Sequence, residues 1–505
     1  MSERNIVIFE DSAAGNFNPL TLTRPVFELI CGMTTLWKNI TADCFYSGAE
    51  VRFICRDYLK DAFQQRVNAK VNNLSRLKDA LFVNGRMLAA FSELPPIDGQ
   101  SEIGLQDGVL IYARLNAKDM DGLSDSISDD PEDFTDRLTS LNIPKKETQG
   151  VRLVNYLWEL ISHNSAAIKA DFEIYGKSEE SQGVIEKGAY IRAGNGSDIK
   201  VYDAEEATKL LMAGELPLYV GEGARIQPNV VVDLTGGPVY IGAHADIRPP
   251  TVIDGPCCIM DSPGTSKKVT IINGAKIREG VTLGPVCRIG CEVEETIIQG
   301  YTNDCHYGFM GHAYLGEWVN VGAMTTNSDL RNDLAHVKVP VNGKLVDTGE
   351  AKVGSFIGDH AKLGIGALLT TGAVVGVMAN VLSSGSMPPN SIPSFCFYRE
   401  DRLSMRFSLQ ALIEIAARTM RRREVAQTPA DIHLFEKVYE LTEEQRNAEI
   451  QKRDRRLAKA PQLVGQASLP VMSGKMSDPP EYDFLDKDTA TLRIIRPLER
   501  EKQKK

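Results

Sequence analysis

The sequence of 505 residues has no long apolar run, no CxxC cysteine pair and no excess of positive charge, although Cys257 and Cys258 are adjacent. Because no stretch of about 18 apolar residues occurs, we expect no membrane-spanning helix. Nine scattered cysteines without a CxxC pair favour free thiols in a reducing compartment over a disulfide framework. The formal net charge of −10 argues against a protein that coats nucleic acid. The first residues lead directly into Glu10 and Asp11, which is not typical of a secretory signal, so we expect a cytoplasmic protein.

Glycine, by contrast, is abundant, with 42 residues that are spread unevenly. In the region from 220 to 387 an apolar residue recurs at every sixth position, and glycine often follows it directly. Neither the helix period of 3.6 nor the strand period of 2 gives this spacing, whereas a hexapeptide repeat does. The repeat positions are Val220, Ile226, Val232, Ile241, Ile247, Ile253, Ile259, Ile271, Ile277, Leu283, Ile289, Phe309, Leu315, Val321, Ile357, Leu363, Leu369, Val375, Val381 and Met387.

The hexapeptide repeat predicts a triangular coil, in which each side is a short strand with one inward-pointing apolar residue. Successive coils would pair like parallel strands, about 4.8 Å apart. Glycine after the inward residue suits a corner where φ is positive or where a side chain would crowd the backbone. Repeats of this kind resemble the left-handed parallel β-helix of acyltransferases. Two interruptions, 261–269 and 329–352, are expected to be loops that leave the coil, and such loops commonly carry binding residues.

The regions that flank the repeat are of a different type. Strands expected at 5–9, 51–55, 80–83 and 108–113, with a helix at 28–40, predict an α/β domain with a mostly parallel sheet. A helical pattern at 152–172 joins this domain to the repeat, and helices broken near Pro429 follow it. The predicted organisation is an α/β, Rossmann-like domain at 1–150, a linker helix and connection at 151–215, a β-helix at 216–396, a helical extension at 397–460 and a mobile tail at 461–505.

The opening EDSAAGNFNPLTLTRPVFEL resembles the N-terminus of sugar nucleotidyltransferases related to the GlmU family. Members of that family are bifunctional N-acetylglucosamine-1-phosphate uridylyltransferase/glucosamine-1-phosphate acetyltransferases. The resemblance continues through LFVNGRML and GPVYIG and is strongest in residues 297–333 and 353–376. It implies an α/β domain that joins a sugar 1-phosphate to a nucleoside triphosphate with Mg²⁺. It also implies a trimeric β-helix that acetylates an amino sugar phosphate with acetyl-CoA.

The N-terminal segment departs from the family at two places. The GxGTRM-type loop is missing, so Arg24 in LTRP, followed by Lys38, is the candidate for binding phosphate. Both could instead be surface cations that cap a helix. The segment Asn84-Gly85-Arg86 stands where the family has a Gly-Asp pair whose aspartate binds Mg²⁺, and Asn84 and Arg86 are further candidates for nucleotide contacts. Asparagine is a poorer ligand for a hard cation than carboxylate, which makes Asp11 and Glu10 the candidate metal ligands.

The β-helix requires a base and a donor for a developing oxyanion if it is to acetylate an amine. Histidine is the usual base because its pKa lies near neutrality. His306 and His312 are six residues apart, which is one side of the coil, so they should lie on successive faces. The segment GHAYLG resembles the catalytic segment of the family and favours His312. Counting back from Asn320 favours His306 instead, because the characterised enzymes have one further hexapeptide there.

Three further residues match positions of the acceptor site in the family. Tyr314 and Asn320 match positions that contact the sugar, and Asn327 lies near an asparagine that completes the site. The asparagines could equally form a side-chain ladder between stacked coils.

Three functional hypotheses follow from these patterns. The first is a bifunctional enzyme with nucleotidyl transfer in the front domain and acetyl transfer in the β-helix. The second keeps the acyltransferase activity alone, with a degenerate front domain. The third is a non-enzymatic trimeric scaffold whose helical C-terminus binds a partner.

Overall fold

The computed structural model describes residues 5–42, 48–93, 95–120, 123, 131–177, 180–265, 267–383 and 387–459. The chain divides into two compact units, Met1–Arg456 and Leu457–Lys505. The predicted tail at 461–505 lies outside the described residues. No helix of the described ranges is long and apolar enough to cross a membrane.

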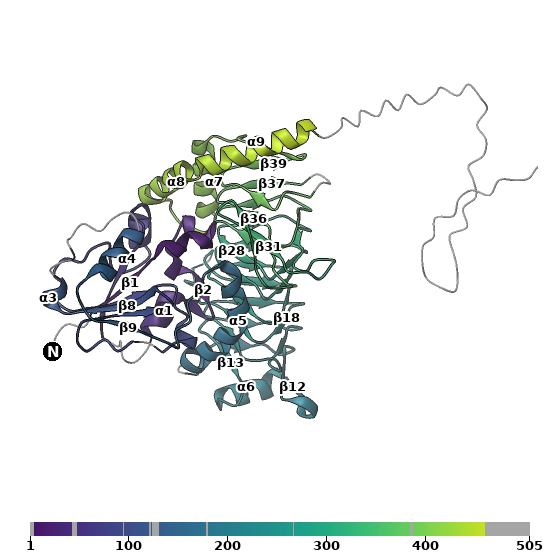
Figure 1. Cartoon of the computed structure of the whole chain (residues 1–505). Coiled ribbons are helices and arrows are strands. Elements are labelled where there is room, and N and C mark those ends of the chain that lie inside the picture. The colour runs from purple at the N-terminus through teal and green to yellow at the C-terminus, as the bar shows by residue number, and fades with distance from the viewer. Residues whose placement is uncertain are drawn as a thin grey trace, which may run out of the picture. The chain divides into compact units, whose positions relative to one another are not determined.

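The N-terminal region is built around one seven-stranded sheet in the order β5-β4-β1-β6-β8-β7-β9 (Figure 1). Its central strand β1 pairs in parallel with β4 and β6, whereas β8 is antiparallel to both β6 and β7. The predicted, mostly parallel α/β sheet is therefore present, and β8 alone runs antiparallel to its neighbours. Its elements are β1 (Asn5–Phe9), α1 (Leu36–Thr41), β4 (Glu50–Ile54), α2 (Lys60–Gln64), β5 (Lys70–Val71), β6 (Ala80–Asn84), β7 (Glu102–Gln106), β8 (Val109–Leu115), α3 (Ala117–Met120), α4 (Pro131–Ser140) and β9 (Lys145–Glu147).

The helix predicted over 28–40 is wrong in its first half. There β2 (Ile30–Cys31) and β3 (Thr34–Thr35) form a small hairpin, and α1 starts only at Leu36. Gly32 turns the chain with φ +79°, and its amide donates to Asn164 Oδ1 at 2.7 Å. Asn164 belongs to α5 (Leu157–Asp171), so a contact across 132 residues outweighs the local helical pattern.

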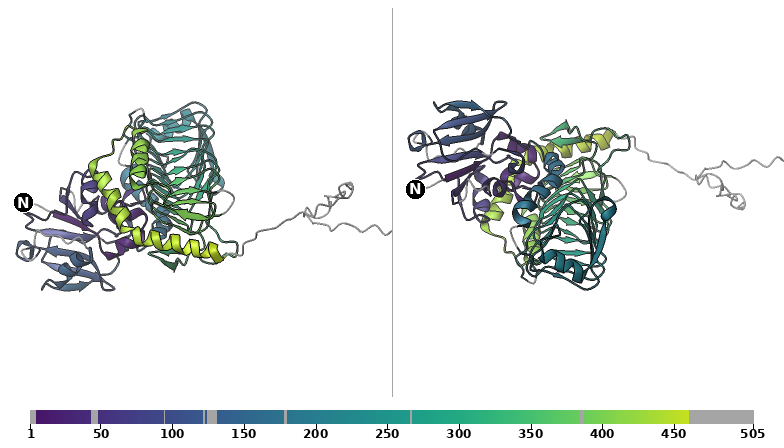
Figure 2. Two further views of the ribbon diagram at one scale, coloured as in Figure 1. Left: turned by 90° about the horizontal axis from the view of Figure 1, so that it is seen from above. Right: turned by 90° about the horizontal axis from the view of Figure 1, so that it is seen from below.

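The region from Val184 onward is a parallel β-helix of three sheets, each built from one side of every coil (Figure 1). Figure 2 views the stack from its two ends. The first sheet contains β10 (Val184–Ile185), β14 (Arg225–Ile226), β17 (Asp246–Arg248), β20 (Ile271–Asn273), β23 (Arg288–Ile289), β26 (Asn303–Asp304), β29 (Asn320–Val321), β34 (Lys362–Leu363), β37 (Asn380–Leu382), β39 (Phe397–Arg399) and the antiparallel β40 (Arg402–Ser404). The second contains the antiparallel β12 (Lys200–Asp203), then β11 (Tyr190–Ala193), β15 (Val231–Asp233), β18 (Val252–Asp254), β21 (Lys276–Ile277), β24 (Glu292–Glu294), β27 (Phe309–Gly311), β30 (Thr326–Asn327) and β35 (Leu368–Leu369). The third contains β13 (Leu218–Val220), β16 (Val239–Ile241), β19 (Cys257–Ile259), β22 (Val281–Leu283), β25 (Ile297–Gly300), β28 (Tyr314–Glu317), β33 (Phe356–Ile357), β36 (Val374–Val375) and β38 (Ser391–Ile392).

The predicted fold class is confirmed: a Rossmann-like α/β domain, a left-handed β-helix of hexapeptide repeats and a helical C-terminus. Three repeat positions are nevertheless wrong. Ile272 and Met310 are the buried residues that continue two of the inward columns, where the sequence pattern predicted Ile271 and Phe309, and the predicted Met387 is 51% exposed and lies outside the strands. Ile272 follows the first interruption, whose length sets the register of the next coil.

Of the two interruptions of the coil, the second forms a hairpin of its own, and the described residues of the first form no helix or strand. The second contains a hairpin, β31 (Lys338–Val341) and β32 (Lys344–Asp347), which turns at Asn342-Gly343 with positive φ at both residues. Its buried Val339 and Val341 belong to the same apolar cluster as residues of the N-terminal region. The hairpin therefore fastens the β-helix to the front domain.

Helices follow the last coil, as predicted. They are α7 (Leu409–Arg421), α8 (Pro429–Leu441) and α9 (Glu443–Lys459), and a shorter α6 (Ala204–Met212) lies near the start of the coil. Thr428 and Asp431 form a capping box, and Pro429 occupies the first turn of α8, which explains the break between α7 and α8. The Phe435 ring of α8 packs edge-on against His360 of the β-helix at 5.3 Å.

Candidate active sites

His312 lies at the corner between β27 and β28, with a positive φ of 47°. Its Nδ1 atom is 2.8 Å from Oδ2 of Asp329, and the two side chains are 15% and 16% exposed. Asp329 is the first residue of the second interruption, which brings its carboxylate back to the corner one coil below. The adjacent Gly311 is held by Asn327, whose amide bonds both the Gly311 N–H and its carbonyl.

A cavity of about 220 Å³ lies beside His312, between α5 and the coil. Trp158 and Ile161 of α5 form its apolar wall, and the charged groups come from Glu295, Glu350 and Lys352. Burial, with the neighbouring Glu279 and Glu294, raises the pKa of Glu295 to about 6, although His312 acts against this shift. The cavity thus places an imidazole, two carboxylates and an ammonium group around one small space.

The contact with Asp329 determines what His312 can do. Burial acts to raise the pKa of Asp329, but the hydrogen bond and charge of His312, together with Lys352, hold it below its usual range. An ionised Asp329 accepts the Nδ1–H proton and so favours the tautomer in which Nε2 is unprotonated. Such an imidazole can accept a proton from an attacking nucleophile.

His306 is on the next corner of the coil, as the six-residue spacing predicted. It is exposed, between the exposed Cys305 and Tyr307. No carboxylate of the described residues pairs with its ring.

The three residues predicted to contact the sugar lie in different environments. Tyr314 is fully buried, and its hydroxyl donates to Gln299 Oε1 at 2.8 Å and accepts from the Ile30 N–H at 2.7 Å. These contacts place Tyr314 at the boundary between the front domain and the β-helix. Asn327 is buried, and its side chain bonds to the backbone of Gly311 on the neighbouring coil. The Asn320 side chain accepts a hydrogen bond from Asn303 Nδ2 at 3.3 Å, also between neighbouring coils.

Arg24 is buried and paired with carboxylates of the β-helix. Its guanidinium is 2.5 Å from Asp359 Oδ2 and 3.7 Å from Glu317 Oε1. Burial acts against its charge, but Asp359, Glu317 and Glu28 together raise the pKa of Arg24. The Thr23 hydroxyl donates to the same Asp359 oxygen at 2.8 Å. The segment LTRP therefore fastens the front domain to the segment GDHAK of the β-helix.

Asp11 and Arg86 form a second buried pair at the ends of β1 and β6. Arg86 Nε and Nη2 reach the two Asp11 oxygens at 2.7 and 2.6 Å, and Asn84 Nδ2 donates to Oδ2 at 2.8 Å. Arg86 Nη1 also donates to the Val154 carbonyl at 2.6 Å. This bidentate geometry uses the charge of both partners.

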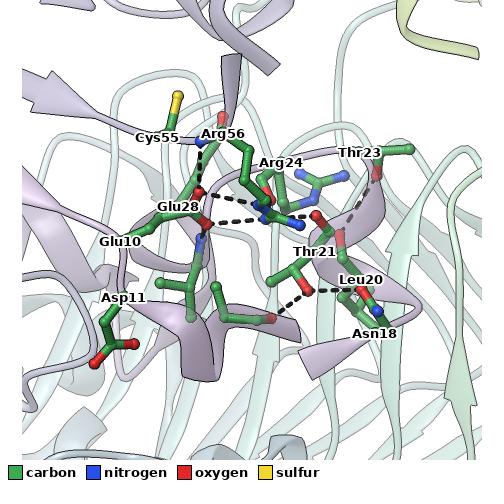
Figure 3. Close-up of polar contacts among 12 residues, drawn as sticks. Glu10, Asp11, Asn18, Leu20, Thr21, Thr23, Arg24, Glu28, Cys55 and Arg56 are labelled. Carbon is green, nitrogen blue, oxygen red and sulfur yellow. Dashed lines mark hydrogen bonds and ion pairs between the residues drawn. The ribbon is translucent and has the colours of Figure 1, made fainter. Parts of the chain in front are cut away.

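Glu10 forms a third pair with Arg56, which Figure 3 shows pointing toward one another while Asp11 points away. The Glu10 oxygens accept from Arg56 Nη2 at 2.9 Å and Nε at 3.1 Å, and from the Val26 amide at 2.8 Å. The Glu10 side chain has no exposed surface. Lys38, by contrast, is exposed, and its Nζ lies 5.8 Å from the Trp37 ring centroid.

These pairings bear on the Mg²⁺ that the resemblance implies. A hard cation needs carboxylate oxygens with free lone pairs. Each oxygen of Glu10 and Asp11 already accepts from an arginine. In this arrangement the two carboxylates do not fit a Mg²⁺ site. No group of three or more acidic, histidine or cysteine side chains in the described part of the chain has the geometry of a metal site.

Sequence reasoning did not single out Asp329, Glu295 or Lys352 as functional residues. Asp329 and Lys352 are the two ends of the second interruption, which the sequence did identify as a place for binding residues. Glu295 follows two other glutamates in CEVEET, and nothing in that pattern distinguishes it from an exposed acidic corner.

Comparison with known proteins agrees with the resemblance. Residues 6–180 match the family described as sugar nucleotidyl transferase. A bifunctional sugar-1-phosphate nucleotidylyltransferase/acetyltransferase of Sulfurisphaera tokodaii is 37% identical over 90 residues, which are 18% of this chain and 22% of that protein. The bifunctional protein GlmU of Methanocaldococcus jannaschii is 30% identical over 115 residues, which are 23% of this chain and 28% of that protein.

Among solved structures, a crystal structure of UDP-N-acetylglucosamine acyltransferase aligns with 42% of this chain and 67% of that chain, at 14% identity and a TM-score of 0.21. The chain thus matches between a fifth and a third of the length of the two curated relatives. Residues 6–180 form a domain of the sugar nucleotidyl transferase family, and part of the chain is similar to GlmU-like nucleotidyltransferase/acetyltransferases.

Proposed function

We propose that this chain is a GlmU-like transferase of nucleotide-sugar synthesis with two activities. The front domain joins a sugar 1-phosphate to a nucleoside triphosphate, and the β-helix transfers an acetyl group from acetyl-CoA to an amino sugar phosphate. The observation that carries the second activity is the His312–Asp329 pair beside a cavity of about 220 Å³. The family match of residues 6–180 supports the first.

In the proposed acetyl transfer, the amine nitrogen of the sugar attacks the thioester carbonyl of acetyl-CoA. His312 Nε2 accepts the proton that the nitrogen loses as the new N–C bond forms. The C–S bond then breaks, and the sulfur leaves as a thiol after it takes the proton from His312. Asp329 holds the imidazole by Nδ1 throughout and stabilises its charged form.

A second candidate is the acetyl transfer alone, and one observation favours it. Arg24, Arg86, Glu10 and Asp11 all use their charges in pairs within the chain. A nucleotide and Mg²⁺ would have to break at least one buried pair to engage these residues. Lys38 is the one predicted phosphate-binding cation that is exposed.

We further propose a homotrimer in the cytoplasm. Exposed apolar side chains stack along one corner of the coil: Tyr307 is 76% exposed, Met324 63% and Ile365 77%. The Met324 N–H donates to the Tyr307 carbonyl at 2.7 Å, so these corners are adjacent. Such a stripe is typical of a surface that another subunit covers. The eight described cysteines are free thiols, as expected in a reducing compartment.

Two parallel assays test the proposed function. Purified full-length protein is incubated with Mg²⁺, each nucleoside triphosphate and N-acetylglucosamine 1-phosphate, and pyrophosphate is measured. A second sample receives acetyl-CoA and glucosamine 1-phosphate, and free thiol is measured. Turnover in both supports the bifunctional proposal, and turnover only in the second supports the second candidate. Silence in both across a wide set of acceptors contradicts an enzymatic role.

A further inference from the structure

An open pocket of about 690 Å³ lies on the first sheet of the β-helix, where the segment after α7 passes over it. Arg248 and Arg288 reach it from β17 and β23, and Arg422 and Arg423 reach it from the end of α7. Lys267 comes from the first interruption of the coil. Five cations therefore converge from three parts of the chain that are far apart in sequence.

Few carboxylates balance these charges. Arg248 pairs with Asp246 at 2.7 Å, and Lys267 lies 3.6 Å from Glu424. Arg288, Arg422 and Arg423 form no ion pair with any residue that the structure describes. The Nε atoms of Arg288 and Arg423 are buried and lack a hydrogen-bond partner among those residues. Because leaving a buried donor unpaired is unfavourable, two such atoms beside one pocket point to a missing acceptor.

Arg423 is the clearest of these groups, since its side chain is only 9% exposed. Burial, with Arg288 and Arg422 close by, lowers its pKa to about 10. Burial, with Arg248 and Arg422, likewise lowers the pKa of Arg288. The cations therefore repel one another, and an anion between them would remove that cost.

The dipole at the C-terminus of α7 does not by itself explain why these cations gather at the pocket. Basic residues near the C-terminus of a helix interact favourably with its dipole, which accounts for Arg421 and Arg422. It does not account for Arg248 and Arg288, which are presented by strands of the coil. The floor of the pocket also carries Ile271, the residue that the repeat predicted to point inward.

We propose that this pocket binds a small organic ligand that carries a diphosphate group, of the nucleoside diphosphate class. Arginine guanidinium groups bind phosphate oxygens in bidentate fashion, and several arginines match an anion of more than one charge. Ile271 offers an apolar surface to an organic moiety, and the amides of Asn273 and Asn303 offer hydrogen bonds to it. The proposal goes beyond the function proposed above, because the pocket lies on a different sheet from the His312 corner. Tighter binding of coenzyme A than of ADP and UDP would overturn it and assign the pocket to the acetyl-CoA of the proposed function.

The test is calorimetric titration of full-length protein with inorganic pyrophosphate, ADP, UDP and coenzyme A. The variants are Arg288→Gln and Arg423→Gln. The matched control is Arg418→Gln, since Arg418 lies on the same helix outside the pocket and pairs with Glu414 at 3.8 Å. We expect at least one diphosphate to bind the wild type and the control equally, and to bind each pocket variant about tenfold more weakly or worse. The ranking of the four dissociation constants shows which kind of diphosphate compound the pocket prefers.

Thermal unfolding provides a second readout that does not depend on heat of binding. The diphosphate should raise the melting temperature of the wild type and of Arg418→Gln, and raise it less in both pocket variants. Without ligand, the pocket variants should be no less stable than the wild type, because a repelling charge has been removed. Equal binding by wild type and pocket variants overturns the proposal. So does the absence of binding by all four probes, or tighter binding of a single-stranded oligonucleotide than of any diphosphate.

Discussion

The His312 corner and the strand ends of the front domain differ in how their charged groups are satisfied. At the strand ends, Glu10, Asp11, Arg56 and Arg86 form bidentate pairs, and the Glu10 side chain has no exposed surface. At the corner, Asp329 binds only one nitrogen of His312, next to a cavity that substrate could enter. A complete buried pair holds the fold together, whereas a pair with one group still available can take part in chemistry.

The largest effect on stability should come from Arg24→Met. The substitution leaves Asp359 and Glu317 buried without their cation, and breaking one side of a buried pair costs about 3–5 kcal/mol. Urea denaturation should show this loss in the free energy of unfolding. The control is Arg331→Met, because Arg331 and Asp333 are also 2.5 Å apart but exposed, and we expect no measurable change there. If both substitutions lower the free energy of unfolding equally, the buried Arg24 pair contributes no more to stability than the exposed Arg331–Asp333 pair.

The next effect concerns the orientation of the imidazole. Asp329→Asn should lower kcat for acetyl transfer by about a hundredfold, with little change in KM, because the wrong tautomer of His312 is then favoured. Thiol release over a range of pH measures it. Asp333→Asn, in the same loop and exposed, should leave kcat unchanged. If Asp329→Asn changes KM alone, the aspartate binds substrate and does not position the base.

A smaller effect should appear in the pH dependence of stability. The pKa of Glu295 is raised from its ordinary value of 4.5 to about 6, so its protonated form is favoured in the folded state. Its contribution to stability is fully present below pH 4.5 and is lost as the pH rises through about 6. The free energy of unfolding of Glu295→Gln should therefore fall less than that of the wild type over this range. Glu222 is exposed, so the free energy of unfolding of Glu222→Gln should depend on pH as that of the wild type does. If Glu295→Gln also shows the wild-type pH dependence, the pKa of Glu295 is not raised.

The smallest expected effect is that of Lys38→Gln, which changes an exposed side chain. Its unfolding midpoint should equal that of the wild type. If Lys38 binds phosphate, KM for the nucleoside triphosphate should rise by about threefold, the size expected for one exposed charge contact. An unchanged KM, measured by pyrophosphate release, would leave the front domain without an accessible phosphate-binding cation among those predicted from the sequence.

The repeat made the fold predictable because six-residue spacing depends only on local geometry. Each inward residue, such as Ile357 or Leu363, is buried wherever its coil stacks on the next. Local spacing could not reveal Ile272 in place of Ile271, since the length of the preceding loop sets the register. The hairpin at Gly32 was missed for a similar reason, because its turn is fixed by Asn164 far along the chain.

The site was predictable only in part. His312 could be identified from the segment GHAYLG, but its partner Asp329 reaches it through stacking of coils, which no short motif encodes. Arg24 is of a residue type typical of phosphate binding, and Tyr314 of one typical of sugar binding. Their burial against Asp359 and Ile30 depends on how the front domain packs on the β-helix, at sequence separations of 335 and 284 residues.

In the proposed acetyl transfer His312, and not His306, is the base. The most direct test measures thiol release from acetyl-CoA with glucosamine 1-phosphate for His312→Ala and His306→Ala side by side. We predict that kcat falls by about 10²–10⁴-fold in His312→Ala, the usual contribution of a general base, and stays near the wild-type value in His306→Ala. A loss of kcat in His306→Ala with activity retained in His312→Ala would contradict the account.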